Sequence, residues 1–272
     1  MDKSEISIAP LNPVIGAEVT GLDLSEPLGP ETFKKLHAAW LEHLVLFFRD
    51  QELTLEQHKN FGRLWGELHV HPSVPSLEGH PEILVIRTDE NSMRAAGHGW
   101  HSDVSCEAEP PKGSILRLEQ VPDSGGDTLF ASMYACYEAL SEHWQRFLSS
   151  LTAIHENEHV HGRPGYGHKK DREFRTNEHP VVRTHPETGR KALYVNSGFT
   201  TRIRGMRSAE SRATLDFLYQ HIQHPDFQCR FSWRPNSIAF WDNRCAQHHA
   251  TYDYHPQVRH GYRVTVAGDR PF

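Results

Sequence analysis

Three residues of the chain have the side chains and the spacing to hold a metal ion. His101 and Asp103 are separated by one residue, so in an extended segment both side chains point to the same side and can reach one ion. A third ligand must come from elsewhere, and His248 is the candidate. Two histidines and one carboxylate on one face of an octahedron leave three positions for a bidentate cosubstrate and O₂, which is the arrangement of non-haem iron(II) oxygenases.

Two arginines near the end of the sequence could bind anions beside such a metal. Arg259 and Arg263 fall four residues apart in a strand-like run, hence on one face and roughly 13 Å apart, too far to share one small carboxylate. One reading is that one guanidinium clamps the distal carboxylate of 2-oxoglutarate while the other binds a second anionic group. The alternative is two solvated strand arginines.

A competing metal motif lies in the middle of the chain. The run from His155 through Glu156 to His159 matches the His-Glu-x-x-His signature of zinc metalloproteases. That signature needs a helix to place both histidines on one face, whereas here it follows the strand-like residues 151–154 and leads into a Gly/Pro-rich segment. We expect it to end a strand, and we keep zinc proteolysis as an alternative function.

The composition is that of an ordinary globular protein. Of the 272 residues 37% are hydrophobic and 24% are charged, and the formal net charge is −6. We expect one domain over residues 1–272, with no membrane partner and a cytoplasmic location, because no segment approaches the roughly 18 apolar residues of a membrane span. The chain also lacks the basic cluster that nucleic-acid binding requires, and its four cysteines have no zinc-finger spacing.

The hydrophobic pattern predicts a mainly β protein with flanking helices. Helical spacing occurs over residues 33–44 and 215–222, and Thr54 and Ser141 are predicted to cap two further helices. Strands are predicted over residues 44–48, 82–87, 114–118, 181–184, 191–195, 227–233, 238–241 and 263–267. Since these strands do not alternate regularly with helices, we expect an antiparallel sandwich or jelly roll.

Residues 160–180 make the longest predicted loop, and loops of this length are usually functional or mobile. We interpret the segment as a candidate lid. His159 and His161 at its start would either contact substrate or be exposed loop histidines.

The sequence resembles the taurine dioxygenase family, which also contains alkylsulfate and aryloxyalkanoate dioxygenases. The resemblance runs from Ile8 to Phe272. It is carried by ordered motifs: Pro13-Val14-Ile15-Gly16-Ala17-Glu18-Val19 with Gly21-Leu22-Asp23-Leu24, Trp100-His101-Ser102-Asp103-Val104, Gly125-Gly126-Asp127-Thr128, Val195-Asn196-Ser197-Gly198-Phe199, Trp241-Asp242-Asn243-Arg244, His248-His249-Ala250, Asp253-Tyr254 and Arg259-x-x-x-Arg263.

The resemblance implies that His101, Asp103 and His248 bind Fe(II). It assigns this role to His248 rather than to the adjacent His249. Thr128 and Arg259 would bind the distal carboxylate of 2-oxoglutarate. A non-catalytic protein of this fold, a further alternative, would be expected to lack one of these residues.

The resemblance also implies a site for the substrate. Arg263, His71 and the backbone at Val104 would bind an anionic group, Phe199 would form a pocket wall, and His161 is a further candidate contact. The family fold is a double-stranded β-helix, a cupin-like jelly roll, and we expect a homo-oligomer, either a dimer or a tetramer.

The implied reaction consumes 2-oxoglutarate and O₂, releases succinate and CO₂, and hydroxylates a carbon of a small anionic organic substrate. A hydroxylated carbon that bears sulfur or oxygen can then collapse with cleavage of the C–S or C–O bond. A sulfonate, a sulfate ester or an aryloxyalkanoate would fit this chemistry.

The substrate pocket departs from the family pattern. Taurine dioxygenase has a tyrosine and an asparagine where this chain has Val74 and Gly97, and a Ser-Phe pair where it has Val160-His161. Polar partners for a small amine are missing, so we predict that taurine is a poor substrate and that a larger or more apolar anion is accepted.

Overall fold

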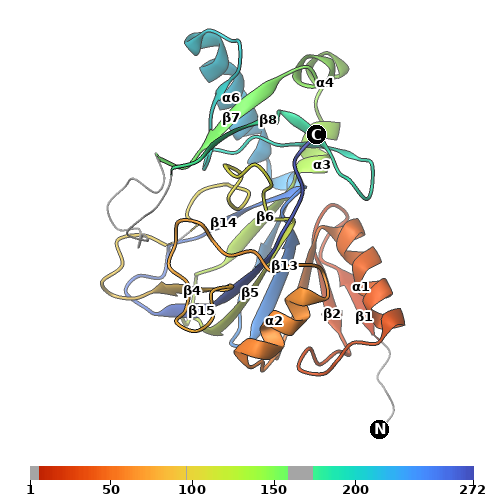
Figure 1. The fold of residues 1–272 in the computed structure, drawn as a ribbon, viewed down its shortest axis with the longest axis vertical. Helices are drawn as coiled ribbons and strands as arrows, with labels where there is room; N and C mark the ends of the chain where they lie inside the picture. Colours follow the sequence, from red (N-terminus) through yellow and green to blue (C-terminus); the bar gives the residue numbers. More distant parts are fainter. Residues whose placement is uncertain (1–5, 96, 159–173) are drawn as a thin grey trace.

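The largest sheet contains seven strands in the order β1-β2-β3-β13-β5-β15-β4 (Figure 1). The computed structural model describes residues 6–95, 97–158 and 174–272. Neighbouring strands are antiparallel except for the parallel pair β2–β3. In sheet order the strands are β1 (Ser7–Pro10), β2 (Ala17–Thr20), β3 (Val45–Phe48), β13 (Ser237–Asp242), β5 (Gly113–Gln120), β15 (Arg259–Val266) and β4 (Ile83–Thr88).

In the part of the chain that the structure describes, three smaller groups of strands make up the rest of the β structure. One sheet has the order β12-β6-β14, and a second has the order β11-β7-β8, while β9 and β10 form a hairpin. Their bounds are β12 (Gln228–Phe231), β6 (Thr128–Ser132), β14 (Ala246–Ala250), β11 (Thr200–Ile203), β7 (Thr152–Glu156), β8 (Thr176–Pro180), β9 (Val182–Thr184) and β10 (Lys191–Leu193).

Aromatic side chains join the seven-stranded sheet to the β12-β6-β14 sheet. Phe47 of β3 stacks on Phe231 of β12, with ring centroids 4.1 Å apart, and meets the edge of Phe130 of β6 at 5.6 Å. The ring centroid of Trp241 of β13 lies 5.7 Å from that of Phe130. Because side chains alternate between the faces of a strand, these residues define the inner face, and the two sheets enclose one core.

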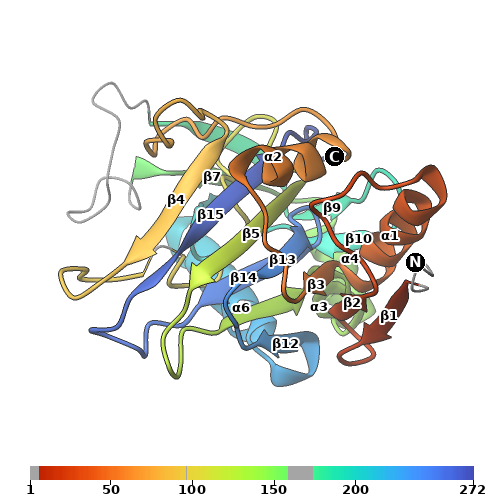
Figure 2. The same cartoon turned by 90° about the horizontal axis from the view of Figure 1, so that it is seen from below.

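Helices cover the outer face of the large sheet. Helices α1 (Pro30–His43) and α2 (Leu55–Arg63) lie beside this sheet (Figure 2). Phe240 of β13 stacks on Trp40 of α1, with ring centroids 4.6 Å apart, and contacts Phe61 of α2. The other helices among the described residues are α3 (Met133–Glu138), α4 (Glu142–Leu148), α6 (Ser208–Ile222) and the 3₁₀ turn η1 (Pro225–Phe227). Within the described part of the chain, no helix has the length and apolar character needed to cross a membrane.

The predicted helix caps are confirmed. Thr54 and Gln57 form a reciprocal capping box at the start of α2, and the Ser141 hydroxyl accepts a hydrogen bond from the backbone N–H of Trp144. The predicted alternation near residue 230 is also observed, because Cys229 and Phe231 are buried.

The predicted loop at 160–180 is wrong in its last part. Residues 176–180 form β8, which pairs with β7. The strand is polar and lacks the apolar alternation used for prediction, because its backbone pairing with β7 rather than burial holds it in place. Residues 159–173, which include His159, His161 and most of the candidate lid, lie outside the described residues.

The metalloprotease alternative is not supported by the local structure. His155 lies on strand β7 rather than on a helix, and its buried ring contacts the Ser105 hydroxyl at 3.0 Å. The helical geometry that this signature needs is therefore absent at His155.

A buried charge cluster holds the turn between β13 and β14. Asp242 accepts hydrogen bonds from Nε and Nη2 of Arg244 at 2.9 and 2.7 Å, and its carboxylate lies 3.0 Å from Nε2 of His185. Burial alone would raise the pKa of the Asp242 carboxyl, but the adjacent Arg244 and His185 hold it well below its usual range. This cluster fixes the turn that leads into β14.

We expect Asp242→Asn to lower the free energy of unfolding at pH 7 by about 3 kcal/mol, because the buried Arg244 loses its buried carboxylate. Since the pKa of Asp242 is depressed in the folded state, its contribution is present above pH about 4 and is lost as the pH falls further. The difference between variant and wild type should therefore shrink in acid. Urea unfolding at pH 7 and pH 3 measures both effects.

Asp226→Asn is the control, because this carboxylate has a side chain that is 80% exposed. It should change the free energy of unfolding by less than about 0.5 kcal/mol. Equal stability of Asp242→Asn and wild type at pH 7 would contradict the role given to the cluster.

Candidate functional site

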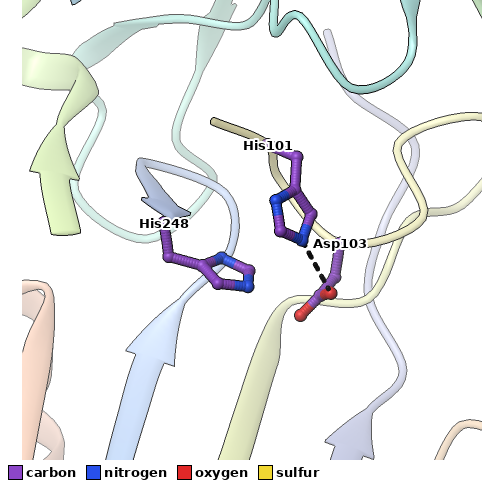
Figure 3. Close-up of side chains that lie close together, drawn as sticks. All are labelled: His101, Asp103 and His248. Atoms are coloured by element: carbon purple, nitrogen blue, oxygen red, sulfur yellow. Dashed lines mark ion pairs between the residues drawn. The ribbon is translucent and has the colours of Figure 1, made fainter. Parts of the chain in front are cut away.

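The three predicted metal ligands come together at one end of the β core. A two-way backbone bridge joins the segment at His101 to β14, with N···O distances of 3.1 and 3.0 Å between His101 and His248. Asp103 follows two residues later, and the ligand atoms of the three side chains all lie within 4.8 Å of one another. Figure 3 shows the two rings and the carboxylate pointing toward a common centre.

The hydrogen bonds fix which nitrogen of His101 can bind a metal. Its Nδ1 lies 2.9 Å from the carbonyl oxygen of Gly99, which can only accept, so Nδ1 carries the hydrogen. Nε2 is then left with a lone pair, and it lies 3.7 Å from Oδ1 of Asp103. This is the tautomer that metal-binding histidines need.

The electrostatics of the cluster also suit a divalent cation. Burial lowers the pKa of both His101 and His248, which keeps the imidazoles neutral. Burial would raise the pKa of the Asp103 carboxyl, but the Arg263 guanidinium and the hydrogen bond from Ser114 lower it well below its usual range. Two neutral imidazoles and one carboxylate are ligands that need no further deprotonation to bind Fe(II).

A buried guanidinium lies in the same cavity. Arg259 is 3% exposed, and its Nε donates to the carbonyl oxygen of Gly126 at 3.1 Å, while its Nη2 lies 3.4 Å from the hydroxyl of Thr128. Among the described residues, no carboxylate lies within 4.0 Å of Arg259. A buried cation with only neutral partners can act as a receptor for an anionic ligand.

Trp233 supports this anion receptor, and it was not among the predicted site residues. Its indole Nε1 donates to the Thr128 hydroxyl at 3.0 Å, so the hydroxyl keeps its own hydrogen for a ligand. The guanidinium of Arg259 also lies over the Trp233 ring, 5.5 Å from the centroid.

The metal cluster and the anion receptor share a cavity of 1060 Å³. Every predicted site residue that the structure describes lines it: His71, His101, Asp103, Val104, Thr128, Phe199, His248, Arg259 and Arg263. The predicted contact His161 lies outside the described residues. Apolar side chains form part of the wall, namely Val74, Pro75, Leu84, Val85, Ile86, Met93 and Leu116.

Two of the positions that depart from the taurine dioxygenase pattern line this cavity. Val74 contributes apolar surface, and Gly97 has a φ of +80°. A Cβ atom at residue 97 would lie 3.3 Å from Cε1 of His101, so a larger side chain there would press on the candidate metal ligand. Residue 97 therefore contributes no polar side chain to the part of the cavity near His101.

His71 lines the same cavity. Its Nδ1 accepts hydrogen bonds from the backbone N–H groups of Ser73 and Val74 at 3.1 and 3.0 Å. In a neutral ring the hydrogen must then be on Nε2, which makes that nitrogen a donor. Arg263 supplies a second donor group, since it lines the same cavity and contacts Oδ1 of Asp103 at 2.6 Å.

A second group of possible metal ligands, His185, Asp242 and Cys245, does not have the chemistry of a metal site. Nδ1 of His185 accepts two backbone N–H groups, at 3.2 Å each, so Nε2 carries the hydrogen and donates to Asp242. The carboxylate of Asp242 is already occupied by Arg244. This group is a structural ion cluster.

The fold and the site define a protein in which two histidines and one carboxylate could hold a metal ion beside the buried Arg259. The family model described as "Taurine catabolism dioxygenase TauD, TfdA family" matches residues 7–265, and the chain belongs to this family.

Individual relatives agree with this assignment. The chain is 40% identical to a Schizosaccharomyces pombe protein provisionally named an alpha-ketoglutarate-dependent sulfonate dioxygenase, over 95% of this chain and 68% of the relative. It is 35% identical to the alpha-ketoglutarate-dependent sulfate ester dioxygenase of Pseudomonas putida, over 98% and 91% of the two chains. The crystal structure of a taurine dioxygenase from Burkholderia xenovorans matches with a TM-score of 0.85 and 38% identity, over 98% and 92%.

The adjacent histidines 248 and 249 allow a direct test of the metal cluster. We expect His248→Ala to weaken Fe(II) binding by more than the roughly 10–100-fold that loss of an outer partner costs, because it removes a ligand. His249→Ala should bind Fe(II) as the wild type does, since the His249 ring packs on His98 and Trp100. Anaerobic titration with Fe(II) measures the affinity of both variants. Weaker binding by His249→Ala than by His248→Ala would overturn the assignment of His248 as a ligand.

Proposed function

We propose that this chain is an Fe(II)- and 2-oxoglutarate-dependent dioxygenase that hydroxylates an organic anion. The single observation that carries the proposal is the shared cavity. It contains a cluster of two histidines and one carboxylate, and beside it the buried Arg259, which has no carboxylate partner among the described residues. A dianionic cosubstrate could chelate a metal at this cluster with one end and bind Arg259 with the other.

In this proposal His101, Asp103 and His248 hold Fe(II). When bound, the iron would couple oxidation of 2-oxoglutarate by O₂, to succinate and CO₂, to hydroxylation of the substrate. Arg259 and the Thr128 hydroxyl bind the distal carboxylate of 2-oxoglutarate and so orient its other end toward the metal ligands. The buried position of these groups excludes water and strengthens their hydrogen bonds.

The proposed substrate is an anion with an apolar body. Arg263 and His71 bind the anionic group, together with the backbone at Val104, and Phe199 packs against the apolar part. The cavity volume of 1060 Å³ exceeds the roughly 300–1,000 Å³ of pockets that hold drug-sized ligands. Sulfonates and sulfate esters, which relatives' names mention, and aryloxyalkanoates belong to this class.

Two facing sheets with the metal ligands at one end fit a double-stranded β-helix of the cupin-like jelly-roll type. The single domain, the homo-oligomeric state and the cytoplasmic location expected from the sequence stay predictions.

Anaerobic addition of Fe(II) and 2-oxoglutarate is expected to give a weak visible charge-transfer band, and aerobic turnover should release succinate. Arg259→Lys should raise the KM for 2-oxoglutarate by about 10–100-fold, because a bidentate charge-assisted pair is lost. Arg212→Lys, on the exposed face of α6, is the matched control. Absence of the band in the wild type would reject the proposed function.

Taurine is expected to be a poor substrate, because Val74 and Gly97 offer no polar side chain to an ammonium group. We expect a sulfonate or sulfate ester with an apolar body to give a kcat/KM at least about tenfold higher, consistent with burial of several methylene groups. A substrate panel scored by succinate and product release measures this ratio. Tight taurine binding with coupled sulfite release would disprove the prediction.

A further inference from the structure

The two oxygens of Asp103 have different surroundings. Oδ2 accepts a hydrogen bond from the Ser114 hydroxyl at 2.7 Å. Oδ1 faces the opposite side, 3.7 Å from Nε2 of His101 and 2.6 Å from Nη1 of Arg263. Of the two oxygens, Oδ1 is therefore the one directed at the histidine that shares the metal cluster.

The backbone of Asp103 is also fixed. Its N–H donates to Oδ1 of Asn243 at 2.6 Å, and its carbonyl accepts from Nδ2 of Asn243 at 3.0 Å. The same Nδ2 donates to the carbonyl of Pro111 at 2.9 Å. With both backbone groups held by one buried amide, the side-chain torsions of Asp103 are its main freedom, and the Ser114 hydroxyl restrains those.

Ser114 itself is held rigidly. It lies near the start of β5, between Trp241 of β13 and Thr265 of β15, and its exposure is 0%. Side chains alternate along a strand, so Ser114 points to the same face as Leu116, which lines the cavity. A central strand with partners on both sides does not move to follow a rotating carboxylate.

We propose that Ser114 is a positioning residue that limits Asp103 to one coordinating oxygen, Oδ1. A carboxylate can bind a metal through one oxygen or through both. Two histidines and a single oxygen leave three of six positions, which a chelating cosubstrate and O₂ can fill. A second oxygen would take one of these three. The inference rests on the proposed function, since it concerns the same metal cluster.

Ser114→Ala tests this inference, because it removes one oxygen atom from a buried site without adding volume. We expect the variant to bind the metal within about threefold of wild type, while the dissociation constant for 2-oxoglutarate rises about tenfold in the metal-loaded protein. Loss of an outer partner commonly lowers metal affinity or activity by roughly 10–100-fold. Here all three ligands remain and Arg263 still contacts Oδ1 of Asp103, so the effect is expected on cosubstrate binding instead. The fraction of succinate release that is coupled to product should also fall.

Binding can be measured without turnover. The ring of Trp241 lies 4.6 Å from that of His248, so quenching of tryptophan fluorescence by Co(II) reports metal binding. The charge-transfer band of the anaerobic Fe(II) protein reports 2-oxoglutarate binding. Ser114→Cys keeps a weak donor of similar size. Its dissociation constant for 2-oxoglutarate should therefore lie between those of Ser114→Ala and the wild type.

Ser237→Ala is the matched control, because Ser237 is equally buried, lies on the neighbouring β13 and bonds to Arg49 and Arg234. It should leave both dissociation constants unchanged. Wild-type affinity for 2-oxoglutarate in Ser114→Ala would overturn the inference, as would loss of metal binding together with a lower midpoint of thermal unfolding. No band in the wild type would instead reject the proposed function.

Discussion

The backbone bridge between His101 and His248 is the constraint on which the site depends. It ties a segment without regular structure to β14, and its two hydrogen bonds bring two imidazoles to a ring distance of 4.1 Å. Asp103 can then reach the same point, because it follows His101 by two positions. The surrounding sheets act mainly to hold this bridge still: β6 pairs with β14 on one side, and β5 carries the hydroxyl that meets Asp103.

The second organising feature is the placement of positive charge. Arg259 and Arg263 lie on one strand, β15, yet they have different partners. Arg259 is buried against a carbonyl, a hydroxyl and an indole ring, whereas Arg263 contacts the carboxylate of Asp103. The two guanidinium groups, four residues apart on one strand, therefore lie in different parts of the cavity, and only that of Arg263 contacts the metal cluster.

Features of the fold and of the site were predictable from the sequence where they depend on residues close together in the chain or on a repeating pattern. The capping box at Thr54, the alternation around Cys229 and the His-x-Asp spacing each depend on residues that are near neighbours. Other features depend on distant partners. Ser114, Trp233 and Asn243 are ordinary residues in the sequence, and their roles follow from hydrogen bonds that span 11, 105 and 140 positions. Strand β8 was missed for a related reason, because its pairing rather than its composition makes it a strand.

The Asn243 amide has a consequence for how the protein acquires its metal. Asn243 and Asp103 are 140 positions apart, and the turn that carries Asn243 leads directly into the strand of His248. An unfolded chain cannot hold these groups together, so the metal ligands are assembled only after the long-range contacts have formed. A metal ion that binds these assembled ligands more tightly than it binds the unfolded chain therefore stabilises the native state, by at most RT ln(1 + [metal]/Kd).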